Sequence, residues 1–190
     1  MRPGCVVMAA GNASRFGENK LLALWRGRSL IERALAAVPA EELAAVVVVT
    51  QYEAVAGMAA ERGFRVVINH EPQLGQSHTI RLGLQALPEC GGALFMVADQ
   101  PLLRRETVAE LVRFWRQEPN SIAALSHGGQ RGNPCLFPAE LFPELLALEG
   151  DRGGSGVIRR HGERLRLLET NAQQLRDVDT QQALEELREG

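Results

Sequence analysis

Short apolar runs alternate with amphipathic segments along the first 115 residues of the chain. The apolar runs are continuous and rich in strand-favouring residues, as strands buried on both faces are: Cys5 to Met8, Leu43 to Val49, Val66 to Ile68 and Ala93 to Val97. The segments between them repeat apolar residues every three or four positions, which is typical of helices that cover a sheet: 30–38, 55–59, 80–87 and 108–115. The alternation predicts βαβ crossovers and an α/β fold, with a mainly parallel sheet between helices on both faces.

After Ser121 the pattern changes, but it contains no internal repeat and no long linker. The segments there are, in order, an apolar segment at Ile122 to Leu125, a glycine-rich connector from Ser126 to Pro134, a short predicted strand at Cys135 to Phe137, helix-like segments at Glu140 to Leu148 and after Gly150, the segment LRLLE at Leu165 to Glu169, a predicted strand around Leu175 to Val178, and a predicted helix over Thr180 to Glu189. A chain of 190 residues suits one substantial core. We therefore expect a single domain over residues 1–190, whose second half extends the same sheet.

Composition argues against several classes of protein. Charged residues make up 23% and the formal net charge is −2, so no sequence-wide attraction to nucleic acid or to an anionic membrane is expected. The cysteines Cys5, Cys90 and Cys135 are odd in number and widely spaced, which argues against a disulfide framework and a structural zinc site. The apolar runs are too short for a signal-peptide core or a membrane span. We expect a cytoplasmic protein without nucleic-acid or membrane partners.

The first predicted strand runs into the segment MAAGNASRFGENKLL, from Met8 to Leu22. Its glycines are separated by five residues and its lysine is followed by leucine, so it is not a Walker A loop, and the GxGxxG fingerprint is absent as well. The small residues Ala9 to Gly11 nevertheless let backbone amides approach a ligand, and Arg15 and Lys20 bring two cations suited to a triphosphate. From these residues alone, a solvated loop with ordinary surface charges is an equal alternative.

Asp99 stands directly after the predicted strand that ends at Val97, in the segment VADQPLL. Ligands of open α/β folds collect at the carboxyl ends of the strands. A carboxylate at that place is a hard oxygen ligand suited to Mg²⁺. The residues alone leave a second interpretation equally open, in which Asp99 caps a turn before Pro101.

The segment GQSHTIRLGL, residues 75–84, predicts a loop that turns into a helix. Backbone amides near Gln76 and Ser77 are then placed to face an anion or the polar edge of a base. Ser77 is also a good N-cap for that helix, and both interpretations can hold together. His78 is interpreted as incidental.

The string AAGNASRFGENKLL resembles the signature of the nucleotidyltransferase family that includes the molybdenum cofactor guanylyl- and cytidylyltransferases. The match includes the residues from Ser14 to Gly17 and Lys20, while Met8 stands where the family usually has another aliphatic residue. The resemblance extends to about Leu187 through the segments GQSHTIR, VADQP, RGNPCLF, GDRGGSG and DVDTQQAL, although Gln181 and Gln182 replace the usual Pro-Glu. It implies a three-layer αβα fold with a Rossmann-like sheet, of the nucleotide-diphospho-sugar transferase type.

The resemblance also implies roles for particular residues. The nucleotide would contact Ala9, Ala10, Gly11, Arg15, Lys20, Asn69 and Ser77, the metal ion Mg²⁺ would bind Asp99 and Asp179, and the acceptor would face Asn133 and Arg152. Because side chains alternate along a strand, Asp177 and Asp179 are expected on opposite faces, and Asp179 is the one chosen to meet Asp99. Asp179 can also be interpreted as a cap for the helix that follows, and Asn133 as part of an ordinary tight turn.

The implied reaction is nucleotidyl transfer, in which a phosphate oxygen of the acceptor attacks the α-phosphorus of a nucleoside triphosphate and pyrophosphate leaves. Arg15, Lys20 and Asp99 would carry catalysis, and no protein nucleophile is needed. Ala10 stands where guanylyl members carry glycine, which favours CTP over GTP. The leading hypothesis is CMP transfer to molybdenum-bound molybdopterin, with delivery of the product to a molybdoenzyme of the xanthine dehydrogenase type. The alternatives are GTP, a sugar or polyol phosphate acceptor, and a non-catalytic carrier of the cofactor.

Overall fold

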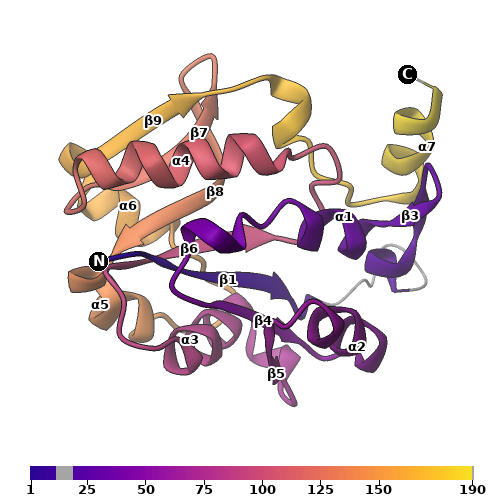
Figure 1. The fold of residues 1–190 in the computed structure, drawn as a ribbon, viewed down its shortest axis with the longest axis horizontal. Helices are drawn as coiled ribbons and strands as arrows, with labels where there is room; N and C mark the ends of the chain where they lie inside the picture. Colours follow the sequence, from indigo (N-terminus) through magenta and orange to yellow (C-terminus); the bar gives the residue numbers. More distant parts are fainter. Residues whose placement is uncertain (12–18, 190) are drawn as a thin grey trace.

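The computed structural model describes residues 1–11 and 19–189, and the strands of this part form a seven-stranded sheet and a short hairpin. The strands of the sheet are β1 (Gly4–Ala9), β4 (Val46–Thr50), β5 (Arg65–Ile68), β6 (Gly92–Val97), β7 (Ile122–His127), β8 (Gln130–Pro138) and β9 (Leu165–Glu169). Their spatial order is β5-β4-β1-β6-β8-β7-β9 (Figure 1). Among the strands described in this sheet, β8 alone runs antiparallel to its neighbours. The predicted α/β fold with a mainly parallel sheet is therefore confirmed.

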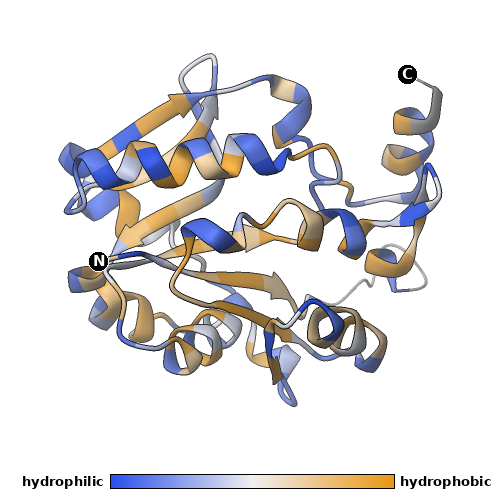
Figure 2. Cartoon of the chain, in the orientation of Figure 1, coloured by the Kyte–Doolittle hydropathy of each residue, from blue (hydrophilic) through white to orange (hydrophobic). Residues whose placement is uncertain are grey.

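Helices cover both faces of the sheet, which gives the predicted three layers. One face carries α1 (Leu30–Ala36), α2 (Glu53–Glu61) and α4 (Arg105–Gln117), and the other carries α3 (Gln76–Ala86), α5 (Phe142–Leu146) and α6 (Ser155–Arg160). Because side chains alternate along a strand, the neighbours Val6 and Val7 of β1 belong to opposite cores. Figure 2 shows the apolar residues concentrated on the strands, with hydrophilic residues on the outer sides of the helices.

Helix α3 packs very closely on β1. A Cβ atom added at Gly83 would lie 2.3 Å from Cγ1 of Val6, so the contact requires a residue without a side chain. The helix begins at Gln76, beside the carboxyl end of the strand, where both elements line the same cavity. The glycine therefore helps to place the start of α3 at the edge of the sheet where ligands collect.

The C-terminal helix α7 (Gln181–Glu189) packs on a small hairpin made of β2 (Leu24–Trp25) and β3 (Arg28–Ser29) (Figure 1). These elements share a separate apolar cluster of buried residues: Trp25, Leu30, Val178, Leu184 and Leu187. The Trp25 indole also donates a hydrogen bond of 3.0 Å to the carbonyl oxygen of Leu187. The end of the chain is thereby held beside the segment that starts at Lys20.

Short 3-10 helices connect the main elements: η1 (Lys20–Leu22), η2 (Ala40–Glu42), η3 (Pro72–Leu74), η4 (Ala139–Leu141), η5 (Gly162–Arg164) and η6 (Ala172–Leu175). No helix in the described part of the chain is both long enough and apolar enough to cross a membrane.

Two predicted elements are wrong. Most of the connector expected from Ser126 to Pro134 is strand, because β7 continues to His127 and β8 starts at Gln130. The turn itself is formed by Gly128 and Gly129, with φ values of 56° and 74° that favour glycine.

The strand expected around Leu175 to Val178 is also absent from the described residues, where η6 ends at Leu175 and an irregular segment follows. The physical reason is that this segment is bound to a loop. The backbone N–H of Val178 donates to the carbonyl oxygen of Asp99 at 2.9 Å.

Candidate active site

The carboxyl ends of β1, β4 and β6 meet at one edge of the sheet. Ala9 lies opposite Thr50, and Met8 lies opposite Val97. The small residues 9–11 and Asp99, which follows β6, therefore line one cavity of about 540 Å³ together with Lys20. We call it the loop cavity. The structure thus brings together Ala9, Ala10, Gly11, Lys20 and Asp99, as the sequence predicted.

Three consecutive side chains at the end of β4 hold the backbone of this loop. Thr50 Oγ1, Gln51 Nε2 and Tyr52 Oη donate hydrogen bonds to the carbonyl oxygens of residues 9, 10 and 11, at 3.0, 2.8 and 3.0 Å in that order. Because these carbonyl groups are held toward β4, the peptide planes that carry the loop's amides are fixed before a ligand arrives. We call this arrangement the carbonyl clamp. Sequence reasoning missed it, because it depends on the register between β1 and β4.

Lys20 joins two carboxylates from distant parts of the chain. Its Nζ lies 2.7 Å from Oδ2 of Asp99 and 3.1 Å from Oδ1 of Asp179. The side chains of Lys20 and Asp99 are only 18% and 20% exposed, against 65% for Asp179, so the contact with Asp99 is the better shielded one. Burial by itself would lower the pKa of Lys20, but the charge of Asp99 and hydrogen bonds to both carboxylates outweigh it, and the pKa is raised. The predicted proximity of Lys20, Asp99 and Asp179 is present.

Lys20 is the only lysine in the sequence, and all the other basic residues apart from histidine are arginines. An ammonium group is a compact point charge with three donors, whereas a guanidinium is a planar fork. The single lysine therefore stands at a position where one small cation lies between two carboxylates. This composition signal could have identified Lys20 before any motif was considered.

Asp177 lies close enough to Asp99 and Asp179 to be affected by their charges, which sequence reasoning had not expected. We call these three carboxylates the acidic cluster. Its Oδ1 accepts a 2.9 Å hydrogen bond from Nε2 of Gln100, the residue that follows Asp99. Burial first, and then the charges of Asp99 and Asp179, raise the pKa of Asp177 to about 6. The expected opposite orientation of the two carboxylates does not apply, because the segment is not a strand.

The carboxylates fit a divalent cation that arrives with substrate phosphates. Mg²⁺ usually takes one or two protein carboxylates and completes its octahedron with waters and phosphate oxygens. Asp99 and Asp179 already share one cation, the Lys20 ammonium, and Asp177 adds a carboxyl group whose pKa is raised by burial first and then by the charge of Asp99. Among the described residues, no group of three or more His, Cys, Asp or Glu side chains forms a ready metal site. A metal here would depend on phosphate ligands as well as on the protein.

Asn69 and Ser77 are buried and do not line the loop cavity. Asn69 is 1% exposed, and its Nδ2 donates a 3.3 Å hydrogen bond to Oγ1 of Thr79, which lines the cavity. Ser77 is 2% exposed and is absent from the lining of both described cavities, while its backbone N–H donates to Gly150. The N-cap of α3 is Gly75, so the capping role predicted for Ser77 is wrong. A φ of 83° at that position explains why glycine is there.

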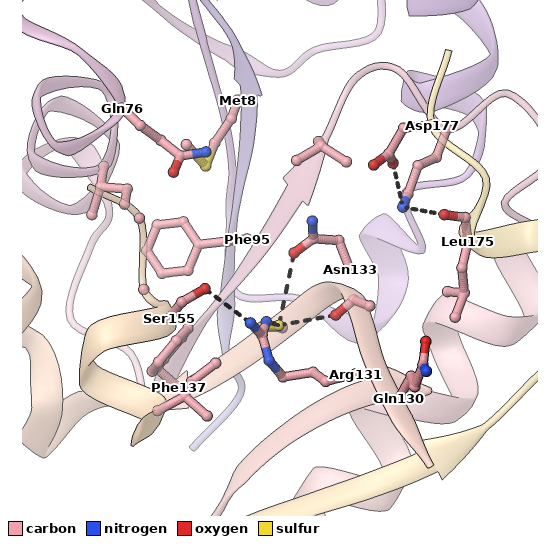
Figure 3. A pocket seen from close by; sticks show the side chains of 18 of the residues that line it. Met8, Gln76, Phe95, Gln130, Arg131, Asn133, Phe137, Ser155, Leu175 and Asp177 are labelled. Carbon is pink, nitrogen blue, oxygen red and sulfur yellow. Dashed lines mark hydrogen bonds between the residues drawn. The ribbon is translucent and has the colours of Figure 1, made fainter. Parts of the chain in front are cut away.

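A second cavity of about 480 Å³ adjoins the first, between the β7–β8 hairpin and α6 (Figure 3). We call it the hairpin cavity. It shares three lining residues with the loop cavity: Met8, Gln76 and Val97. Asp99 and Lys20 line the loop cavity, and Asp177 lines the hairpin cavity. The acidic cluster therefore contributes a carboxylate to each of the two spaces, while Asp179 lines neither.

The hairpin cavity combines a buried aromatic wall with an exposed polar side. Phe95 and Phe137 pack edge to face, with ring centroids 5.9 Å apart and an interplanar angle of 76°. Arg131, from the hairpin, donates a 2.9 Å hydrogen bond to Oγ of Ser155 at the start of α6 (Figure 3). Asn133, predicted to face the acceptor, also lines this cavity.

Among the described residues, four predicted site residues line neither cavity: Asn69, Ser77, Arg152 and Asp179. Arg152 is exposed and is absent from the linings of the two described cavities, although Asp151 lines the loop cavity and Gly153 the hairpin cavity. Arg15 lies outside the described residues, together with Ser14. The cation that the structure assigns to the loop cavity is therefore Lys20.

Comparisons with known proteins agree with this fold. A model of the MobA-like NTP transferase domain matches residues 5–165. The Purine catabolism protein PucB of Bacillus subtilis is 26% identical over 188 residues, which cover 92% of this chain and 90% of PucB. The Nicotine blue oxidoreductase of Paenarthrobacter nicotinovorans is 30% identical over 185 residues, which cover 92% of this chain and 91% of that protein.

Solved structures show the same similarity along the whole chain. Rv0371c of Mycobacterium tuberculosis H37Rv is 25% identical, with a TM-score of 0.82 and coverage of 100% of this chain and 99% of that chain. A complex of the same protein with manganese is 24% identical, with a TM-score of 0.80 and full coverage of both chains. The family match ends before Asp177 and Asp179, whereas these structural matches include that segment.

Proposed function

The chain belongs to the family of MobA-like NTP transferase domains, and we propose that it transfers CMP from CTP to the terminal phosphate of molybdenum-bound molybdopterin, releasing pyrophosphate. The product would be the cytosine dinucleotide form of the cofactor. One relative, the Purine catabolism protein PucB, has a name that fits a product passed to a molybdoenzyme of the xanthine dehydrogenase type. The proposal describes the protein as an enzyme with two substrates and one divalent metal ion.

One observation carries the proposal: two adjoining cavities are lined by different members of one cluster of charged side chains. Transfer of a nucleotidyl group needs a site for the triphosphate, a site for the acceptor, and charge control between them. The loop cavity contains Lys20 and Asp99, and the hairpin cavity, on the other side of Met8, contains Asp177. This arrangement suits an in-line attack across the shared wall.

The protein would contribute position and charge. Asp99 and Asp179 would hold Mg²⁺, which when bound neutralises phosphate charge and aligns the triphosphate. Lys20 would exchange its carboxylate contacts for phosphate oxygens and stabilise the charge that develops on the departing pyrophosphate. The carbonyl clamp would hold the loop amides in place, and Arg15 is expected to add a second cation. No protein nucleophile takes part.

Ala10 supports CTP as the nucleotide. It lines the loop cavity, is 3% exposed, and its carbonyl group is held by Gln51. A methyl group on a fixed backbone leaves less room beneath a base than glycine does, which disfavours a purine. GTP is the competing nucleotide within the same fold.

The competing acceptors are a sugar phosphate and a polyol phosphate, and a non-catalytic cofactor carrier is the competing class. The hairpin cavity supports a molybdopterin-type acceptor, because its aromatic wall suits a flat ring system better than a polyhydroxylated chain. One relative is named an oxidoreductase, so an assay must also distinguish nucleotidyl transfer from a redox reaction.

Release of pyrophosphate tests the proposal. Purified protein with Mg²⁺ is incubated with CTP, GTP, ATP or UTP, and with molybdenum-bound molybdopterin, glucose 1-phosphate or erythritol 4-phosphate as acceptor. We expect release from CTP with the molybdopterin acceptor to exceed release from GTP by about tenfold or more. Equal rates with CTP and GTP would refute the nucleotide assignment. Release only with a sugar or polyol phosphate would refute the acceptor, and no release with any pair would indicate the carrier or a redox enzyme.

A further inference from the structure

Gln100 is a buried polar residue whose side chain is only half satisfied. It is 3% exposed and lines the hairpin cavity. Its Nε2 donates to Oδ1 of Asp177 at 2.9 Å and to the carbonyl oxygen of Leu175 at 3.3 Å. Its Oε1 is buried, and no group among the described residues donates a hydrogen bond to it. Buried polar atoms without a partner are rare in folded proteins, so this acceptor calls for an explanation.

The orientation of the Gln100 amide is fixed by its neighbours. Both partners of Nε2 are oxygen acceptors, a carboxylate and a backbone carbonyl. Rotation of the amide by 180° would place Oε1 against these two oxygens and lose both hydrogen bonds. The free acceptor therefore keeps one direction, and Figure 3 shows Asp177 and Leu175 together on one side of the cavity. Because Gln100 also lines the hairpin cavity, a ligand with a suitably placed donor group could satisfy this acceptor.

The other residues that line the cavity indicate what kind of ligand would donate a hydrogen bond to Oε1 of Gln100. Phe95 and Phe137 form an edge-to-face pair in its wall, and the buried side chains of Ile80 and Leu145 add apolar surface. Such walls favour the faces of a flat ring and disfavour a fully hydrated chain. A ligand that satisfies both the apolar wall and the isolated acceptor is a planar heterocycle with an N–H group at its edge.

We infer that Oε1 of Gln100 accepts a hydrogen bond from an edge N–H of a pteridine-type ring in the acceptor, and that Gln100 is a specificity-determining residue of the hairpin cavity. This inference rests on the proposed function and deepens it, because it names the part of the acceptor that is recognised. The same side chain is hydrogen-bonded to Asp177, which lies near Asp99 and Asp179, the proposed metal ligands. Gln100 would thereby position the acceptor ring relative to the reacting phosphates.

The variant Gln100→Met tests this role, because it keeps the length of the side chain and removes both polar atoms. We expect the KM for the molybdopterin acceptor to rise about tenfold, while the KM for CTP stays within twofold and the Tm stays within about 2 °C of the wild type. Gln117→Met, on the exposed end of α4, is the matched control and should leave both constants unchanged. An unchanged acceptor KM in Gln100→Met, or an equal rise for both substrates, would overturn the inference.

A binding measurement separates this inference from the proposed function. Lumazine and 1,3-dimethyllumazine share the pteridine ring, but methylation removes the ring N–H groups, and both can be titrated against the protein by fluorescence. We expect lumazine to bind about tenfold more tightly to the wild-type protein, and the preference to shrink in Gln100→Met. Equal binding of the two ligands by the wild type would overturn the inference even if Gln100→Met failed to fold. An active enzyme with equal binding refutes only the role of Gln100, whereas absence of pyrophosphate release refutes the proposed function.

Discussion

The backbone N–H of Val178 donates a 2.9 Å hydrogen bond to the carbonyl oxygen of Asp99. The bond joins the loop after β6 to the irregular segment before α7, and it brings the residues on both sides of Val178 close to Asp99. Val178 itself is fully buried in the cluster that α7 forms with Trp25. Packing of the C-terminal helix and assembly of the acidic cluster are therefore coupled through one residue.

Removal of the Asp99 charge should abolish turnover while leaving the fold in place. Asp99→Asn is nearly isosteric, and Asp99 is the carboxylate in closest contact with Lys20. We expect kcat for pyrophosphate release to fall at least about a hundredfold, because charge stabilisation is the main contribution that such a site makes. The control is Glu61→Gln on the exposed side of α2, which should be unaffected. Substantial activity in Asp99→Asn would exclude Asp99 as a metal ligand.

Lys20 should be needed as an ammonium and should be protected by substrate. Lys20→Met leaves the carboxylates without their shared cation, so we expect a loss of activity of about a hundredfold, with partial retention in Lys20→Arg. Since Lys20 is the only lysine, an amine-directed reagent labels one side chain besides the N-terminus, and mass spectrometry of the peptides reads it directly. CTP with Mg²⁺ should slow labelling of Lys20 and leave the N-terminal amine unaffected. Equal labelling with and without nucleotide would argue against phosphate binding at Lys20.

The carbonyl clamp should affect the nucleotide more than the acceptor. Tyr52→Phe removes one of its three hydrogen bonds, the one to the carbonyl oxygen of Gly11, and leaves the ring in place. We expect the KM for CTP to rise about three- to tenfold, with the acceptor KM unchanged, because the loop amides lose part of their fixed orientation. Steady-state kinetics with each substrate varied in turn provides the measurement. A change confined to the acceptor KM would contradict the placement of the nucleotide in the loop cavity.

Ala10 should control the choice of nucleotide. Ala10→Gly adds room in the loop cavity, so we expect the preference for CTP over GTP, measured as a ratio of kcat/KM values, to fall about tenfold. The fall should come mainly from a gain with GTP. An unchanged ratio would mean that base recognition is determined elsewhere, for example in the residues that start α3.

Two helix glycines offer a matched test of the packing. Gly83→Ala places a Cβ atom 2.3 Å from Val6 and should lower the free energy of unfolding by about 1–3 kcal/mol. Gly57→Ala, in α2, meets no atom within 4 Å and should raise it by about 0.5–1 kcal/mol, because alanine favours the helix. Denaturant titration of both variants gives the comparison. Equal effects would show that the contact of α3 with β1 is looser than the structure indicates.

The parts of the fold that follow from local pattern were predictable from the sequence. Continuous apolar runs predicted β1, β4 and β6. The start of β8 was missed because its residues 130–133 are polar or small and pair only through the hairpin register. The strand expected around Leu175 was wrong, because its backbone is bonded to a loop that no local pattern identifies.

The residues of the candidate site that belong to recognisable sequence motifs were predicted. Ala9 to Gly11, Lys20 and Asp99 each follow a strand or resemble a family segment, and they do meet in one cavity. Asp177 and Gln100 were missed for a shared reason. They contact each other although they are 77 positions apart in the sequence, which no local pattern shows. In addition, the alternation of side chains along a strand that does not form had predicted that Asp177 points away from Asp99.

Mass analysis of the reaction product tests the central claim most directly. Wild-type protein is incubated with Mg²⁺, CTP and molybdenum-bound molybdopterin, and Asp99→Asn is treated in parallel. We predict a product whose mass equals the acceptor pterin plus one CMP moiety, formed together with one pyrophosphate per product and absent with Asp99→Asn. Recovery of unchanged CTP and acceptor, or formation of an equal amount of guanylylated product from GTP, would contradict the account.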